Sequence, residues 1–270
     1  MIASGIATLQ ALLLVVTFGG FVDARDVDLD IEGNVYVVDA GSDRLIRYGT
    51  EGDSIGSIGG FGDGEEEFDQ PVAVCASRGN DIYVADYGNH RIQRFDRSLD
   101  FIATLRTRDA VDERVRFGYP LDVAVSRQGD VHILDGENRR LLVVTPAGAF
   151  IRTIGDVGAG EGRMVDPQRL ELDQDDNVYV LDDGAVKVYD PFGAWLRRLP
   201  LPSGLTPRSL AVDGDTLVVT GDSTLFIAPL ADLSAGRSHR VDHDIVAART
   251  REGFLLLVGK VRGSIRKLTE

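Results

Sequence analysis

The chain has 270 residues, of which 31 are glycine and 9 are proline, and this length and composition fit one domain with many turns and few long helices. Its formal net charge of −14 at pH 7 argues against a nucleic acid as partner, because a phosphate backbone would be repelled. The single cysteine excludes an intramolecular disulfide and any metal site built from cysteine pairs.

An almost uninterrupted apolar run occupies the N-terminus, from residue 6 to residue 22. In one interpretation the run is an export signal that ends in the small-x-small site Val22-Asp23-Ala24, although no lysine or arginine precedes it. In the other, residues 12–18 form an outer β-strand of the fold. The first interpretation predicts a periplasmic or secreted protein, and the second predicts a cytoplasmic one.

The rest of the chain repeats a short pattern, in which a polar turn leads into an apolar strand that usually carries a tyrosine and ends in an aspartate. The clear copies are residues 33–39, 80–86, 129–135 and 176–182, and weaker copies are residues 215–220 and 253–258. The tyrosine position falls at residues 36, 83, 132, 179, 218 and 256. Repeats of about 40 to 50 residues with several short strands are typical of propeller blades.

Each unit contains the elements of a four-stranded sheet. An apolar first strand, which in four units follows a proline, precedes the tyrosine strand, and two further strands follow, as at residues 92–95 and 101–105. Such a sheet has two apolar faces, and only packing between neighbours in a closed ring buries both. The sequence therefore predicts an all-β fold, a six-bladed β-propeller of four-stranded antiparallel blades, over residues 21–270.

The sixth unit is one strand short, because its third strand, residues 265–268, lies two residues from the end. Residues 12–18 would supply the missing outer strand, and Gly19-Gly20-Phe21 then matches Gly59-Gly60-Phe61 after the outer strand of the first unit. Residues 1–20 are thus either a ring-closing strand of the last blade or an export signal, and both interpretations stay open.

The second unit carries a family resemblance. Its tetrapeptide Asn89-His90-Arg91-Ile92 stands where the NHL repeat has its Asn-His-Leu signature, and the corresponding tetrapeptides of the first and third units are Ser42-Asp43-Arg44-Leu45 and Asn138-Arg139-Arg140-Leu141. The chain thus resembles the NHL-repeat β-propellers over residues 21–268. The resemblance implies a propeller that binds proteins, ligands or, in some animal members, RNA. Some relatives are enzymes, namely a zinc-dependent amidating lyase and lactonase-like propellers with a metal in the central channel.

The metal ligands of such enzymes have few candidates here. The histidines are His90, His132, His239 and His243, and no three of them occupy equivalent positions in different units, as a zinc ion in the channel would require. Two acidic residues, Asp28 and Glu171, lie at first-strand positions that are Cys75, Ala124 and Ala211 elsewhere, and they are the candidates for a Ca²⁺ site. We expect no cofactor and no catalytic residue, with Ca²⁺ or Zn²⁺ in the central channel as the alternative.

Acid and base also recur together, in the pairs Asp39/Arg44, Asp86/Arg91 and Asp135/Arg140. In each pair the aspartate ends the second strand and the arginine opens the third, so the two side chains can meet across the hairpin. A pair that recurs with the repeat indicates a structural role, since catalysis would need one unique pair.

The function predicted from the sequence is that of a non-catalytic NHL-repeat propeller, a monomeric scaffold for an unidentified protein or small-molecule ligand. We expect it to be bacterial and associated with the cell envelope, without a nucleic acid partner. The alternative is a metal-dependent lyase or hydrolase with its site in the central channel.

Overall fold

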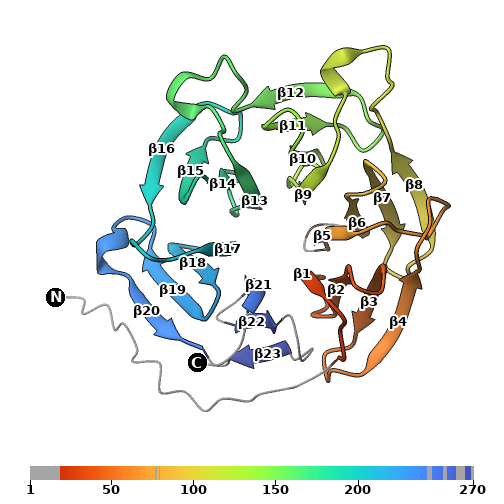
Figure 1. Cartoon of the computed structure of the whole chain (residues 1–270), viewed down its shortest axis with the longest axis horizontal. Helices are drawn as coiled ribbons and strands as arrows, with labels where there is room; N and C mark the ends of the chain where they lie inside the picture. Colours follow the sequence, from red (N-terminus) through yellow and green to blue (C-terminus); the bar gives the residue numbers. More distant parts are fainter. Residues whose placement is uncertain are drawn as a thin grey trace.

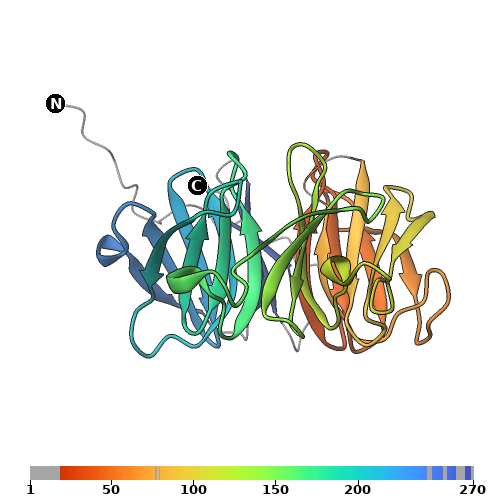
Figure 2. The same ribbon diagram turned by 90° about the horizontal axis from the view of Figure 1, so that it is seen from above.

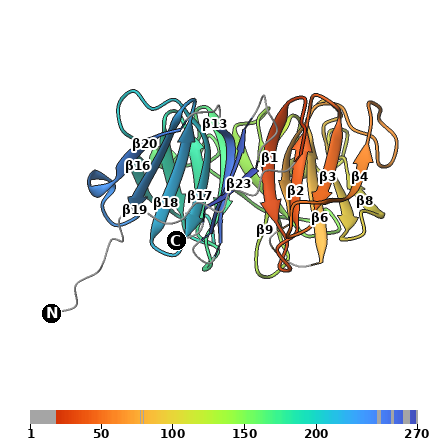
Figure 3. The same ribbon diagram turned by 90° about the horizontal axis from the view of Figure 1, so that it is seen from below.

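The structure, a computed structural model, describes residues 19–76, 78, 80–241, 245–251, 254–259 and 265–268. These residues form antiparallel sheets that stand side by side around a central axis, with the first strand of each sheet innermost (Figure 1). Seen from the side, the ring is a flat disc whose strands run between its two faces (Figures 2 and 3). None of the helices in this part of the chain has the length and apolar character of a membrane span.

Five sheets are four-stranded blades. The first blade contains β1 (Ala24–Leu29), β2 (Val35–Asp39), β3 (Arg44–Tyr48) and β4 (Ser54–Gly59). The second contains β5 (Pro71–Cys75), β6 (Asp81–Asp86), β7 (Arg91–Asp96) and β8 (Phe101–Leu105). The third contains β9 (Pro120–Val125), β10 (Val131–Asp135), β11 (Arg140–Val144) and β12 (Phe150–Ile154).

The fourth blade contains β13 (Pro167–Leu172), β14 (Val178–Asp182), β15 (Ala185–Tyr189) and β16 (Trp195–Pro200). The fifth contains β17 (Pro207–Asp213), β18 (Thr216–Gly221), β19 (Thr224–Pro229) and β20 (Arg237–Arg240). The remaining sheet contains β21 (Ile245–Arg251), β22 (Phe254–Gly259) and β23 (Ile265–Leu268). Three short 3₁₀ helices lie in the connections, η1 (Glu113–Val115), η2 (Gly160–Gly162) and η3 (Leu233–Ala235).

The prediction of six four-stranded blades is wrong, since the structure has five such blades. Among its described residues, the last unit contributes the three strands β21, β22 and β23. The segment predicted to supply a fourth strand, residues 12–18, lies outside the described residues. The three-stranded sheet stands between the fifth blade and the first, where β21 packs against β17 and β1 and completes the circle (Figure 1).

The strand sequences explain the arrangement within a blade. As predicted, a proline is the first residue of β5, β9, β13 and β17, where its missing N–H leaves no ladder bond unmade. The second strands, such as β2 and β14, are buried along their whole length because a neighbouring blade covers each face of the sheet. The outermost strands, such as β4, are half exposed.

Apolar clusters join each sheet to the next. The cluster between the first blade and the three-stranded sheet includes Val27 and Val37 on one side and Val246 and Val258 on the other. Phe21 belongs to the same cluster, and its ring packs edge-on against Tyr48 at a centroid distance of 6.0 Å. The folded unit thus includes residues that precede β1.

Candidate functional site

The pairing register of the first strands places equivalent residues in two layers around the axis. The upper layer, as we name it, consists of Asp26, Ala73, Asp122, Arg169, Ser209 and Ala247. The lower layer, two residues further along each strand, consists of Asp28, Cys75, Ala124, Glu171, Ala211 and Arg249. Four carboxylates and two guanidinium groups therefore line the inner ends of the sheets, and we call this set of six residues the channel cluster.

Arg249 gathers three of the carboxylates. Its guanidinium nitrogens lie 3.4 Å from Asp26 Oδ2, 3.5 Å from Asp28 Oδ1 and 3.8 Å from Glu171 Oε2. β21 carries the arginine, the neighbouring β1 carries the aspartates and the more distant β13 carries the glutamate, so the contacts join the inner strands of three sheets. In this buried setting the attraction between opposite charges is stronger than at the surface, so Arg249 holds three separate sheets together.

The same acids also bind the backbone of the next blade. The Asp26 and Asp28 carboxylates accept hydrogen bonds from the N–H groups of Val74 and Ala76, at 3.0 and 2.7 Å. The carboxylate of Asp122 accepts one from Leu170, at 2.8 Å. The inner edge of a first strand has no partner strand, and these side chains satisfy N–H groups that would otherwise be buried without an acceptor.

Burial changes how these acids titrate. Desolvation raises the pKa of Glu171 to about 8, although the nearby Arg249 lowers it, and desolvation raises the pKa of Asp122 to about 6. The pKa of Asp28 is also raised by burial. Burial opposes the charge on Arg249, but Asp26 and Glu171 outweigh it and keep the pKa of the guanidinium above its ordinary value. The cluster therefore combines a charged arginine with a glutamate whose charged form is disfavoured by burial.

The channel cluster does not fit a metal ion. The structure brings Asp28 and Glu171 together, as a Ca²⁺ site would need, but Arg249 lies between them and supplies the positive charge. Over the described residues there is no group of three or more His, Cys, Asp or Glu side chains arranged to hold a metal. A calcium site needs six or more oxygen ligands, which these two residues do not provide.

The described histidines lie in different blades of the fold. His132 is buried in β10, where desolvation lowers its pKa to about 4, and His90 lies in the turn before β7 against Tyr119. The outer strand β20 holds His239, and His243 lies outside the described residues. Cys75 is buried in the lower layer, and desolvation raises the pKa of its thiol to about 12.

Two of the three predicted acid–base pairs are in contact. Arg91 Nε lies 2.7 Å from Asp86 Oδ2, and Arg140 Nε lies 3.4 Å from Asp135 Oδ2. Among the contacts of the described residues there is no ion pair between Asp39 and Arg44.

Asp39 instead accepts hydrogen bonds from the backbone N–H groups of Val22 and Asp23 and from the Ser42 hydroxyl. The fourth blade has an equivalent pair that the sequence analysis missed, Asp182 with Lys187 at 2.7 Å, because its turn is shorter than in the first three units.

The aspartates of these pairs have a shared second role, which the sequence pattern did not reveal. Each accepts hydrogen bonds from backbone N–H groups at the entrance to the first strand of its own blade, from Asp23, Asp69, Gly118 and Asp166. The basic partners, in turn, donate to carbonyl oxygens of the loop that precedes the blade, as Arg91 does to Asp63 and Glu67. These contacts fasten loops to strands.

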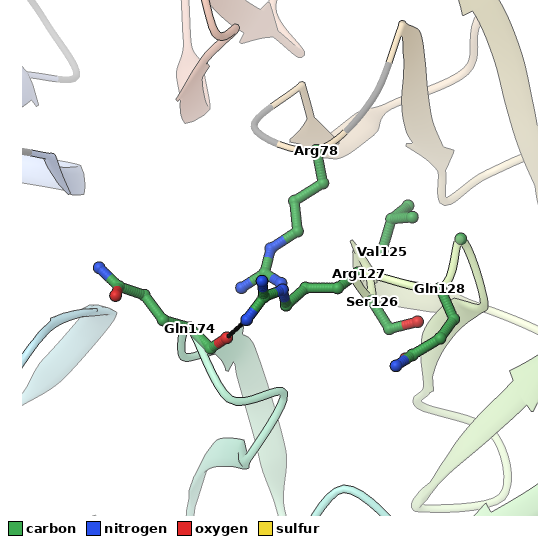
Figure 4. Close-up of a pocket in the computed structure, with 7 residues that line it drawn as sticks. Arg78, Val125, Ser126, Arg127, Gln128 and Gln174 are labelled. Atoms are coloured by element: carbon green, nitrogen blue, oxygen red, sulfur yellow. Dashed lines mark hydrogen bonds between the residues drawn. The ribbon is translucent and has the colours of Figure 1, made fainter.

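A pocket opens at the mouth of the channel, among the turns that join the first and second strands of the second, third and fourth blades. Its volume is about 670 Å³, and we name it the mouth pocket (Figure 4). Its lining consists of Arg78, Val125, Ser126, Arg127, Gln128, Gly129 and Gln174. A signal was present in the sequence, because Arg78, Arg127 and Gln174 occupy the same turn position in three consecutive units.

The comparisons with known proteins agree with this geometry, which defines a β-propeller. The family model named "NHL repeat" matches residues 68–95, from the end of the connection before β5 into β7. The chain is therefore a β-propeller that carries an NHL repeat, as the resemblance predicted. A search of curated proteins found no match.

Solved structures share the fold at low sequence identity. A virginiamycin B lyase from Staphylococcus aureus is 12% identical with a TM-score of 0.63, and the match covers 92% of this chain and 80% of that one. A gluconolactonase from Xanthomonas campestris is 14% identical with a TM-score of 0.70, covering 95% and 89%. The WD40 repeats of RRP9 are 10% identical with a TM-score of 0.68, covering 94% and 96%. At these identities the likeness concerns the fold alone.

Proposed function

We propose that this protein is a non-catalytic binding propeller, a rigid monomeric ring that presents its loops and channel mouth to a protein or small-molecule ligand. The observation that carries the proposal is the position of Arg249 among the carboxylates of the channel cluster. A propeller enzyme that works with a channel metal needs free carboxylate oxygens at this place. Here a side chain of the protein itself provides the cation.

The hydrogen bonds of the same acids support the proposal. Asp26, Asp28 and Asp122 each bind a backbone N–H of the neighbouring blade, so one oxygen of each acid serves a joint between blades. A metal ion would also be repelled by the guanidinium a few ångströms away. The channel cluster is thus suited to closing the ring, and binding is left to the surfaces around it.

The alternative is a metal-dependent lyase or hydrolase, and one observation favours it. Strongly raised pKa values, such as those of Glu171 and Asp122, occur at many active sites. Buried ion-pair networks raise pKa values in the same way, and the fold likeness extends to the WD40 repeats of RRP9 as well as to the lyase and the lactonase. The likeness therefore does not favour an enzyme.

Metal analysis of the purified protein tests the proposal. We expect no stoichiometric calcium or zinc, and we expect the melting temperature to stay unchanged when EDTA, Ca²⁺ or Zn²⁺ is added, since a ligand stabilises only a state that binds it. One equivalent of either metal, together with a fall in the melting temperature on chelation, would overturn the proposal in favour of the metal-dependent enzyme.

A further inference from the structure

The mouth pocket combines basic side chains that the repeat brings together. Arg78 and Arg127 hold equivalent places in the turns of the second and third blades, and Gln174 holds that place in the fourth. Figure 4 shows the two guanidinium groups side by side at the centre of the pocket, next to the backbone of Gln174. Two positive charges thus meet on a chain whose net charge is −14.

The two arginines share one carboxylate. Arg78 forms an ion pair with Asp176, at 2.8 Å, and donates to the carbonyl oxygen of Asp173. Arg127 contacts the same carboxylate only through its backbone N–H, at 3.1 Å to Oδ1. Within the described part of the chain, the Arg127 guanidinium has no carboxylate in ion-pair distance, so the pocket carries an excess of one positive charge.

Arg127 is held in place with most of its donors unused. Its one side-chain hydrogen bond in the described contacts runs to the carbonyl oxygen of Gln174, at 3.0 Å. A guanidinium has five N–H donors in a fixed fork, which fits a carboxylate or a phosphate with two parallel hydrogen bonds. Gln128 and Ser126 line another part of the same pocket, away from the guanidinium, and add a neutral amide and a hydroxyl (Figure 4).

We propose that the mouth pocket binds a small organic anion through Arg127 and Arg78, with a carboxylate or phosphate group on the guanidinium pair and further polar groups on Gln128 and Ser126. The volume of about 670 Å³ lies within the range of small-molecule sites. The protein as a whole repels anions, so the recognition must be local. This inference rests on the proposed binding function and names the class of ligand.

Calorimetric titration of the whole chain with citrate, glucose 6-phosphate and inorganic phosphate tests the inference, with glucose as the neutral probe. We expect saturable binding of at least one of the anions and none of glucose. Citrate and the phosphates separate a carboxylate site from a phosphate site. An Arg127→Gln variant should bind at least tenfold more weakly, and Arg127→Lys should retain part of the affinity, because lysine keeps the charge but loses the fork.

Arg198→Gln is the matched control, since it removes one positive charge from an exposed position of the outer strand β16. It should bind as the unaltered protein does. Equal weakening in both variants would show a general effect of net charge and overturn the inference, as would the absence of binding for all three anions. Neither result would affect the metal analysis, so the proposed function and this inference fail separately.

Discussion

The channel cluster and the mouth pocket both bring arginines from different blades together, but their charge balances are opposite. In the channel, one guanidinium, that of Arg249, faces three carboxylates, and each of the two aspartates also binds a backbone N–H. At the mouth, Asp176 pairs with the guanidinium of Arg78, and Arg127 contacts this carboxylate only through its backbone N–H. The channel contacts bring more acids than bases together, whereas the mouth pocket holds one positive charge in excess and suits an anion.

The difference shows how a repeat protein separates stability from binding. Both regions use positions that the repeat makes equivalent. The ring geometry therefore brings these side chains together without any additional segment of chain. Deep in the channel, an uncompensated charge would be expensive, and the acids there are paired with Arg249 or with backbone N–H groups. In the solvent-facing turns an unbalanced charge costs little, so these positions are free to bind a ligand.

The largest effect should come from removing the channel cation. We expect Arg249→Met to lower the free energy of unfolding by about 4 kcal/mol at pH 7, because it leaves buried carboxylates without their partner. Denaturant titration followed by circular dichroism measures the change. Arg198→Met is the control and should change stability by less than about 0.5 kcal/mol. A similar small loss in Arg249→Met would mean that the channel arginine does not hold the ring together.

Much of the fold could be predicted from the sequence, because turn residues and strand periodicity act locally. The prolines that open β5, β9, β13 and β17 and the outer strands β8 and β12 lie where they were expected. The number of complete blades could not be predicted in this way. It depends on which segment pairs with β23, and such a pairing between distant segments leaves no local signal.

The candidate site was predictable only in part, for a similar reason. Asp28 and Glu171 were identified because they depart from the small residues at their position, but Arg249 was missed although it lies in the same layer. Its blade matches the repeat weakly, so the position was not aligned. The sequence analysis therefore considered Asp28 and Glu171 as candidate Ca²⁺ ligands without the arginine that contacts both.

A second comparison sets Phe21 against Phe61, which follow the same Gly-Gly pair. Phe21 is buried against Tyr48, whereas the side chain of Phe61 is 78% exposed. We expect Phe21→Ala to cost about 3 kcal/mol of unfolding free energy and Phe61→Ala almost nothing.

Mass spectrometry of the N-terminus of the purified protein complements this test. Cleavage after Ala24 would remove Phe21 and the N–H groups of Val22 and Asp23 that bind Asp39, so we expect the folded protein to retain them. A stable protein that starts after Ala24 would contradict this expectation.

The recurring pairs offer a smaller contrast, between Arg91 and Arg44. Both occupy the first position of a third strand, but Arg91 is buried in contact with Asp86, whereas Arg44 is exposed. Arg91→Ala should cost about 2 kcal/mol, because it breaks the ion pair and the bonds to the preceding loop, and Arg44→Ala should be nearly neutral. Thermal melting measures both, and anion affinity at the mouth pocket should change in neither. If Arg91→Ala melted at the same temperature as the unaltered protein, the result would contradict a structural role for the Asp86–Arg91 pair.

The smallest expected effect concerns the protonation of Glu171. Its pKa in the folded state is about 8 against an ordinary value of 4.5, so between these values the folded protein holds a proton that the unfolded chain has released. The contribution of Glu171 to the free energy of unfolding is therefore highest below pH 4.5 and is lost as the pH rises toward 8. Glutamine imitates the protonated acid at every pH. The difference between the two pKa values corresponds to about 5 kcal/mol, but 20% of the Glu171 side chain is exposed and solvent screens its charge. The Glu171→Gln variant should therefore match the unaltered protein near pH 4 and exceed its unfolding free energy by about 1 to 2 kcal/mol at pH 9.

Glu171→Gln also separates the two views of the channel, through denaturant titrations across this pH range. If the glutamate only balances Arg249 and closes the ring, the variant keeps its fold and its anion affinity, and the pH dependence of stability becomes shallower. A variant that is less stable than the unaltered protein at pH 9 would show that the charged carboxylate is needed there, as it would be if a bound cation outweighed Arg249. The sign of this small difference therefore tests the charge balance on which the contrast between channel and mouth depends.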